Sequence, residues 1–199
     1  MDVGHRSNYY HDVYKGDAER IVYYTATPDK IEANFTLLAD NRVGAFVAGV
    51  DSTSFFSVDN IVHLTVDAYK TAVPIDKAAF LGENGFVYQT WLLTSGQIGC
   101  IAQAASNRAT GSKSILSFVF DPSSMAVIDT KVIVDGSCLA LNKNTAPLHH
   151  VRPSGLFFEK EKCFLYFSAH AEDGSVQVIK TLISDPFAEH GRIAVPLEF

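Results

Sequence analysis

The stretch Lys162–Ala169 reads KCFLYFSA, and four large apolar or aromatic residues follow one another at its centre. In an extended chain, the odd-numbered positions from Cys163 to Phe167 point to one side and the even-numbered positions from Phe164 to Ser168 to the other. Both sides of the segment are apolar or small. The stretch therefore predicts a β-strand that is packed on both faces.

The same period of two runs through most of the chain. The apolar segments are rich in Val, Ile, Phe and Tyr, and clusters of Gly, Asn, Asp, Ser and Pro separate them. No segment of helical length carries a convincing amphipathic stripe, so the sequence predicts an all-β fold. The other predicted strands are Arg20–Ala26, Phe35–Ala39, Arg42–Val50, Ile61–Ala68, Phe86–Leu93, Ile98–Ala104, Ser114–Phe120, Met125–Val134, Leu156–Glu159, Ser175–Leu182 and Arg192–Val195.

A repeat is visible among these strands. The segments VGAFVAG from Val43, IGCIAQA from Ile98 and CFLYFSA from Cys163 each follow an apolar strand and a tight polar turn. A third strand and a more polar fourth one follow each segment, the fourth within YKTAVPID, MAVIDTKVIVDG and GRIAVPLEF. Three four-stranded antiparallel units in a row predict a β-propeller or part of one. A β-sandwich is the alternative.

Residues 33–199 hold the three predicted blades. Residues 1–32 lie outside the repeat and form an N-terminal arm that ends in one strand, a candidate for closing a blade. Propellers usually have about four to eight blades, so three leave the ring open. We therefore expect a homo-oligomer or a piece of a longer chain.

The amino-acid composition limits the classes of partner that the protein can bind. The 199 residues include 16 Lys and Arg against 22 Asp and Glu, a net charge of −6, and the basic residues are scattered. This balance excludes a nucleic-acid surface, and no apolar run approaches the roughly 18 residues of a membrane span. The three cysteines, Cys100, Cys138 and Cys163, share no CxxC spacing and predict ordinary buried thiols.

Several familiar catalytic motifs are absent from the sequence. It contains no GxGxxG, P-loop, GxSxG or HExxH pattern, so we predict no cofactor. His149 and His150 are adjacent, and in a regular strand they would point to opposite faces. They could not both bind one ion from such a strand, and we predict no metal site.

The segment His149–His170, HHVRPSGLFFEKEKCFLYFSAH, carries a resemblance. Arg-Pro followed by two buried strands resembles the opening of sialidase-like propellers, although Val-Arg-Pro-Ser here replaces their Arg-Ile-Pro. AEDGSVQV from Ala171 has the turn glycine of the Asp-box in those families but not the full motif. In style, the chain from about residue 33 looks like the propellers of bacteriophage tail spikes and endosialidases. This resemblance implies that Arg152 holds a sugar carboxylate; the alternative is that Arg152 pairs with a loop acid.

Other residues complete this hypothesis. Trp91 and Tyr88 lie in one predicted inner strand, where aromatic faces would stack on sugar rings, although Trp91 could instead fill the space between blades. His149 or His150 would hydrogen-bond sugar hydroxyls. Glu159 is the first acid to test as a general acid or base.

From these residues we predict a carbohydrate-recognising propeller module of a phage tail spike or related extracellular protein, with or without glycan cleavage. Its partner would be an acidic or neutral polysaccharide, with no nucleic acid and no membrane insertion. One alternative is a structural or assembly module of a virion or complex. The other is a sialidase-like glycoside hydrolase completed by a second chain. The predicted location is a virion or the extracellular space, with the cytoplasm as the alternative.

Overall fold

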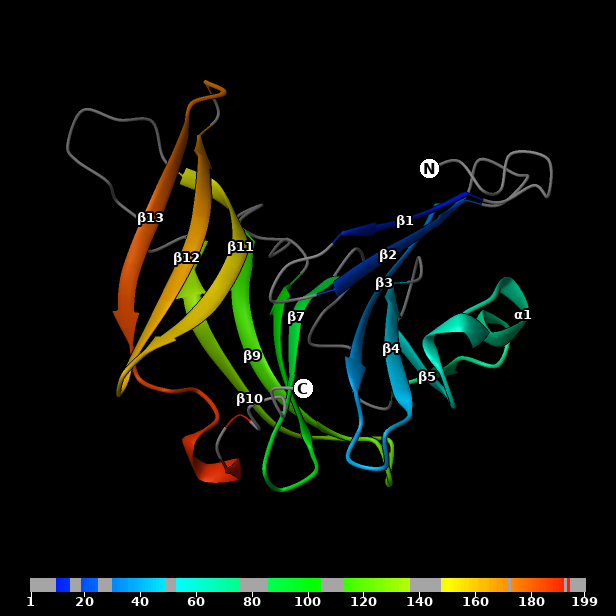
Figure 1. The fold of residues 1–199 in the computed structure, drawn as a ribbon. Helices are drawn as coiled ribbons and strands as arrows, with labels where there is room; N and C mark the ends of the chain where they lie inside the picture. Colours follow the sequence, from blue (N-terminus) through cyan, green and yellow to red (C-terminus); the bar gives the residue numbers. More distant parts are fainter. Residues whose placement is uncertain are drawn as a thin grey trace.

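A computed structural model describes residues 10–14, 19–24, 30–48, 53–75, 86–104, 113–136, 148–171, 173–191 and 193 of the chain. Over these residues the fold is all-β, as predicted, and consists of three antiparallel sheets whose strands follow chain order (Figure 1). Within the described part, the only α-helix is the single turn α1 (Val66–Tyr69). No described helix has the length and apolar character that crossing a membrane would require.

The first sheet has the order β1-β2-β3-β4-β5-β6, the second β10-β9-β8-β7 and the third β11-β12-β13. Every neighbouring pair is antiparallel. The strands are β1 (Tyr10–Tyr14), β2 (Glu19–Tyr24), β3 (Lys30–Leu37), β4 (Val43–Ala48), β5 (Thr53–Val58), β6 (Val73–Pro74), β7 (Phe86–Leu92), β8 (Ile98–Gln103), β9 (Ser114–Asp121), β10 (Ala126–Asp135), β11 (Leu148–Glu159), β12 (Lys162–Ala171) and β13 (Val176–Ile183).

The second sheet lies between the other two, and both faces of its central strands β8 and β9 are buried. On one face, Cys100 and Phe118 pack with Phe46 of the first sheet. On the other face, Ile101 and Val119 form a second cluster with residues of the third sheet. All six residues of β8 are buried, which explains its nearly unbroken apolar sequence.

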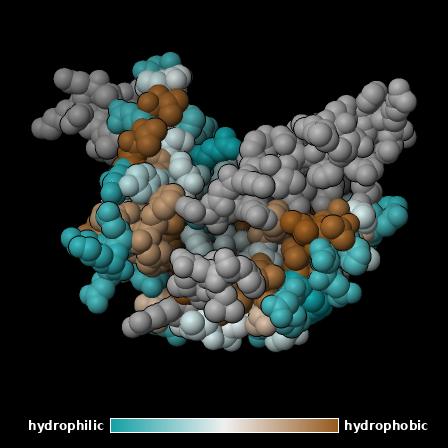
Figure 2. Space-filling view, viewed as in Figure 1, coloured by the Kyte–Doolittle hydropathy of each residue, from teal (hydrophilic) through white to brown (hydrophobic). Residues whose placement is uncertain are grey.

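The outer faces of the first and third sheets differ. Residues of the chain between β5 and β6, among them Leu64 and Tyr69, pack against the outer face of the first sheet. The outer face of the third sheet has no such cover from described residues. Val178 is 78% exposed there, and Figure 2 shows hydrophobic residues on the surface of this region among hydrophilic ones.

KCFLYFSA forms part of β12, and its alternation is confirmed. Cys163, Leu165 and Phe167 are buried against the second sheet. The positions between them, from Phe164 to Ser168, are only partly buried. The prediction of a strand packed on both faces is therefore wrong, because only the inner face is covered by the described chain.

One predicted strand of the repeat is also wrong. Ile61–Ala68 was predicted as a strand, but it forms the 3-10 helix η1 (Ile61–His63) and the start of α1, and the third strand of the first sheet's repeat is β5. Asn60 begins η1 because its side-chain oxygen accepts a hydrogen bond from the Val62 N–H. The predicted strand Arg192–Val195 lies mostly outside the described residues.

The third sheet therefore has three described strands rather than the predicted four. Ile193 instead forms an isolated bridge with Leu93, at the end of β7. The predicted N-terminal arm of residues 1–32 contains two strands, β1 and β2, which pair with each other and extend the first sheet beyond β3.

Candidate functional site

The first strands of the three repeats, β3, β7 and β11, lie next to one another. Buried side chains join them through hydrogen bonds to backbone groups. The Thr90 hydroxyl donates to the Phe35 carbonyl at 3.3 Å, which links β7 to β3. The Gln89 Oε1 accepts from the Leu156 N–H at 2.7 Å, which links β7 to β11. These bonds fix the relative positions of the strands, because an unpaired buried backbone group is costly.

Two of the predicted sugar-binding residues meet where β7 and β11 lie side by side. The Arg152 guanidinium carbon lies 5.4 Å from the centre of the Tyr88 ring, within the range of a cation–π contact. Tyr88 sits at an irregularity in the pairing of β7 with β8 and is half-buried. No described acid forms an ion pair with exposed Arg152, so the alternative of a paired loop acid has no support among the described residues.

The residues around Arg152 are polar. Ser168 is its register partner on β12, and His150 is the partner of His170. Register partners in an antiparallel sheet share a face, so all four side chains lie on the outer face of the third sheet. Ser168 Oγ and His170 Nε2 are 3.0 Å apart. We call Arg152, His150, Ser168, His170 and Tyr88 the Arg152 site.

Ser168 and His170 were not predicted as site residues. The signal was available in the two-residue alternation, which places both on the face of β12 that carries no Leu or Cys. What the sequence did not supply was the register that puts them opposite Arg152 and His150. His149 lies in β11, but its side chain is outside the described part of the structure.

The other predicted site residues lie apart from the Arg152 site. Trp91 is half-buried and its ring centre is 5.7 Å from that of Phe187, so it fills space between sheets, as the alternative held. Glu159 is exposed at the far end of β11, seven residues from Arg152, which in a strand is roughly 20 Å. At that distance Glu159 cannot act on a sugar held by Arg152.

Asp40 offers no general acid either. It lies in the turn between β3 and β4, where Arg42 Nε is 2.7 Å from Asp40 Oδ2. The hydrogen bonds from Arg42 lower the pKa of the Asp40 carboxyl below its ordinary value of 3.8. Asp40 is therefore ionised near neutral pH and already paired.

A buried amide on β3 has no partner among the described residues. Asn34 is only 1% exposed, and neither its Oδ1 nor its Nδ2 makes a hydrogen bond with them. Asn34 is the register partner of Phe46, so its side chain lies on the face of the first sheet that packs against the second. An unsatisfied buried amide costs free energy of folding.

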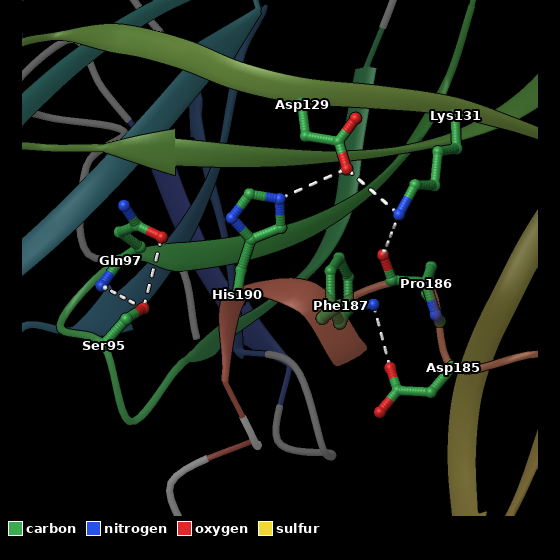
Figure 3. Close-up of polar contacts among 8 residues, drawn as sticks. All are labelled: Ser95, Gln97, Asp129, Lys131, Asp185, Pro186, Phe187 and His190. Carbon is green, nitrogen blue, oxygen red and sulfur yellow. Dashed lines mark hydrogen bonds and ion pairs between the residues drawn. The ribbon is translucent and has the colours of Figure 1, made fainter.

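A second polar cluster lies on β10, away from the strands that form the Arg152 site. Asp129 Oδ2 is 3.0 Å from Lys131 Nζ and 3.3 Å from His190 Nε2 (Figure 3). His190 belongs to the 3-10 helix η4 (Ala188–His190), which follows the third sheet. Burial raises the pKa of Asp129, but the hydrogen bonds and charges of Lys131 and His190 outweigh it and lower that pKa overall.

The Arg152 site is suited to an anion. A guanidinium binds a phosphate or carboxylate through two parallel hydrogen bonds, and the Ser168 hydroxyl and the histidine rings can add further donors. The Tyr88 ring lies against one side of the guanidinium. The Arg152 site is therefore suited to bind an anionic group next to the Tyr88 ring, on which a sugar can pack.

Comparisons with solved structures show which folds the chain resembles. MPT-1, a GDP-Man-dependent mannosyltransferase from Leishmania mexicana, is 26% identical, with a TM-score of 0.69 over 96% of this chain and 68% of that chain. MPT-4, a mannose phosphorylase from the same organism solved with a phosphate ion, is 25% identical, with a TM-score of 0.68 over 96% and 67%. A hypothetical protein from Leishmania major is 26% identical, with a TM-score of 0.69 over 96% and 68%.

These similarities overturn the predicted function. Two of the three solved structures are named as enzymes that process mannose or GDP-Man, and none comes from a phage or a virion. The prediction of a tail-spike module is wrong, as are its alternatives, the virion assembly module and the sialidase-like hydrolase. The predicted resemblance was carried by short blades and turn residues, which report architecture rather than chemistry.

No curated protein matches the sequence. The family model described as "Protein of unknown function (DUF1861)" matches residues 2–189, which is nearly the whole chain. The chain belongs to this DUF1861 family.

Proposed function

We propose that this protein transfers mannosyl groups in a reaction that involves a phosphate-bearing reactant, and that the Arg152 site binds the phosphate. The observation that carries the proposal is the likeness to both a mannosyltransferase and a mannose phosphorylase over 96% of the chain. Their reactants share a phosphate group, as inorganic phosphate or as part of GDP-Man. Exposed Arg152, which has no described acid as an ion-pair partner, is the group best suited to hold it.

The surroundings of Arg152 support a phosphate rather than a lone carboxylate. A phosphate presents more acceptor oxygens than one guanidinium can pair, and Ser168 and His170 lie on the same face as further donors. The Tyr88 ring lies beside the guanidinium, where it would also border a bound mannose. A carbohydrate partner, predicted from the sequence, remains part of this proposal, now as a reactant.

The finer architecture also belongs to the proposal. We propose that the three sheets are consecutive blades of a β-propeller, with β3, β7 and β11 as the innermost strands. Each sheet runs in chain order, and β7 lies next to both β3 and β11. Solved structures of this family would test it by the presence of one axis common to all blades.

The activity can be tested with two product assays. The purified protein is incubated with mannose 1-phosphate and mannose, and released phosphate is measured; a parallel reaction with GDP-mannose measures released GDP. Arg152→Ala should lower kcat/KM by about 10- to 150-fold, because a hydrogen bond to a charged group contributes about 1.5–3 kcal/mol.

Arg42→Ala is the matched control. Arg42 is an exposed arginine that pairs with Asp40 in the turn between β3 and β4, away from β11. It should leave kcat/KM unchanged. A folded wild-type protein that releases neither product, or an Arg152→Ala variant with wild-type kcat/KM, would refute the proposal.

A further inference from the structure

Three potential metal ligands converge on the outer strand of the second sheet. Asp129 of β10 and Glu189 and His190 of η4 each offer one ligand atom, and these atoms all lie within 4.8 Å of one another. Asp129 and His190 are partly buried, and Glu189 is exposed. The residues come from parts of the chain about 60 positions apart, so the fold itself brings them together.

The spacing suits a small divalent cation. Asp129 Oδ2 and His190 Nε2 are 3.3 Å apart, close to the separation of two neighbouring donors about 2.0–2.2 Å from a tetrahedral ion. One imidazole and two carboxylates are a donor set that transition metals such as Zn²⁺ accept, whereas Mg²⁺ and Ca²⁺ prefer oxygen alone. Glu189 needs only a side-chain adjustment to join them, because it is exposed.

A cation already lies against this cluster. Lys131 Nζ is 3.0 Å from Asp129 Oδ2 and also donates to the Pro186 carbonyl at 3.3 Å (Figure 3). The hydrogen bond to Asp129, together with the negative charges of Asp129, Glu189 and Asp185, raises the pKa of Lys131. Three carboxylates therefore act on one ammonium group. The second partner, Pro186, would keep Lys131 hydrogen-bonded when a stronger cation takes its place at Asp129.

We propose that Asp129, Glu189 and His190 bind one divalent transition-metal ion of the Zn²⁺ type, in competition with the Lys131 ammonium group. The ion would join η4 to β10. It would thereby hold in place the segment before η4, whose Phe187 ring packs against Gly99 of β8. This site is separate from the Arg152 site, and its binding does not depend on the proposed mannosyl transfer.

The test measures Zn²⁺ binding to the full chain by competition with a chromogenic zinc chelator in a phosphate-free buffer. We expect one Zn²⁺ per chain. His190→Ala and Glu189→Gln should each weaken binding by at least about tenfold, since each removes or neutralises a ligand. Glu189 is exposed, so Glu189→Gln should fold even where a change at partly buried Asp129 does not.

His63→Ala is the matched control, because His63 is an exposed histidine in η1. It should leave zinc binding unchanged. Lys131→Met should tighten zinc binding by about tenfold, because it removes the competing positive charge while keeping the length of the side chain. A purely structural ion pair would predict no zinc binding in any variant.

Each result decides the proposal. Loss of binding in His190→Ala and Glu189→Gln, with tighter binding in Lys131→Met, supports it. Absence of zinc binding below about 100 µM in the wild type would overturn it, as would equal binding in wild type and His190→Ala. Weaker binding in folded Lys131→Met would also overturn it, since Lys131 would then be a supporting group rather than a competitor.

Discussion

The second and third sheets are both built from strands in chain order, yet they differ in how many faces the described chain buries. The second sheet is covered on both faces, and its strands β8 and β9 are almost entirely buried. The third sheet is covered only on the face that meets the second. Its outer face carries Arg152, Ser168 and His170, together with exposed apolar residues such as Val178.

This difference explains where chemistry can be placed. A strand with two buried faces must be apolar at nearly every position, because unpaired polar groups are costly to bury. Four polar residues of the second sheet are buried, and three of them, Gln89, Thr90 and Gln103, each bond a neighbouring inner strand; the fourth is Ser117. A strand with one open face has room for charged groups, and the Arg152 site uses that face.

The largest expected change in stability comes from a residue buried between the second and third sheets. Phe187 is 1% exposed, and it packs into the cluster between the second and third sheets. Phe187→Ala should lower the free energy of unfolding by about 3–5 kcal/mol, because it removes a large buried ring and leaves a cavity. Val178→Ala on the open face is the control and should change it by no more than about 0.5 kcal/mol.

Urea denaturation of both variants measures these values. Equal losses for Phe187→Ala and Val178→Ala would contradict the comparison, because they would mean that the outer face of the third sheet is as well packed as its inner face.

A second prediction concerns the bond between the two sheets. Gln89 Oε1 accepts from the Leu156 N–H, and both residues are buried. Gln89→Ala leaves this N–H without its partner and should lower the free energy of unfolding by about 1–3 kcal/mol. Hydrogen exchange of the Leu156 amide should be faster in Gln89→Ala. An unchanged or slower exchange rate would show that Gln89 does not protect this amide.

A third prediction has the opposite sign. Asn34 is buried without a hydrogen-bond partner among the described residues, so Asn34→Leu removes an unsatisfied amide and keeps a similar volume. The free energy of unfolding should rise by about 1 kcal/mol, measured by urea denaturation. A loss of stability would mean that the amide has a partner in solution, such as a bound water.

The smallest expected effect concerns the turn that ends β9. The hydrogen bond from the Ser123 hydroxyl lowers the pKa of the Asp121 carboxyl below its ordinary value of 3.8. A lowered pKa stabilises the fold above the ordinary value, and this contribution is lost as the pH falls below about 4. Thermal melts should show that the wild type is more stable than Asp121→Asn near neutral pH and that this difference in the free energy of unfolding, less than about 1 kcal/mol, disappears below about pH 4. A difference that is constant from pH 7 to pH 3 would contradict this assignment.

The sequence predicted the second sheet best. Its four strands are confirmed, and Asp121-Pro122 ends the third of them. The apolar pattern is least broken in β8 and β9, whose two faces are both buried. The first sheet was harder, because IVHLTVDA from Ile61 alternates like a strand. Local capping decides otherwise: the Thr65 hydroxyl accepts from the Ala68 N–H and begins a helical turn.

The candidate site was predictable only in part. Arg152 and Tyr88 were named from the sequence and do meet. Ser168 and His170 join them through the register of β11 with β12, which includes two irregularities that a regular alternation does not predict. Glu159 looked close to Arg152 in the sequence, but an extended strand carries it away to the other end.

We propose that a phosphate-bearing mannose compound binds where β7 and β11 meet. A crystal of the protein soaked with mannose 1-phosphate tests it most directly. We expect the phosphate within hydrogen-bond distance of the Arg152 guanidinium and the sugar against Tyr88. A ligand bound at another place, with Arg152 turned to solvent, would contradict the account.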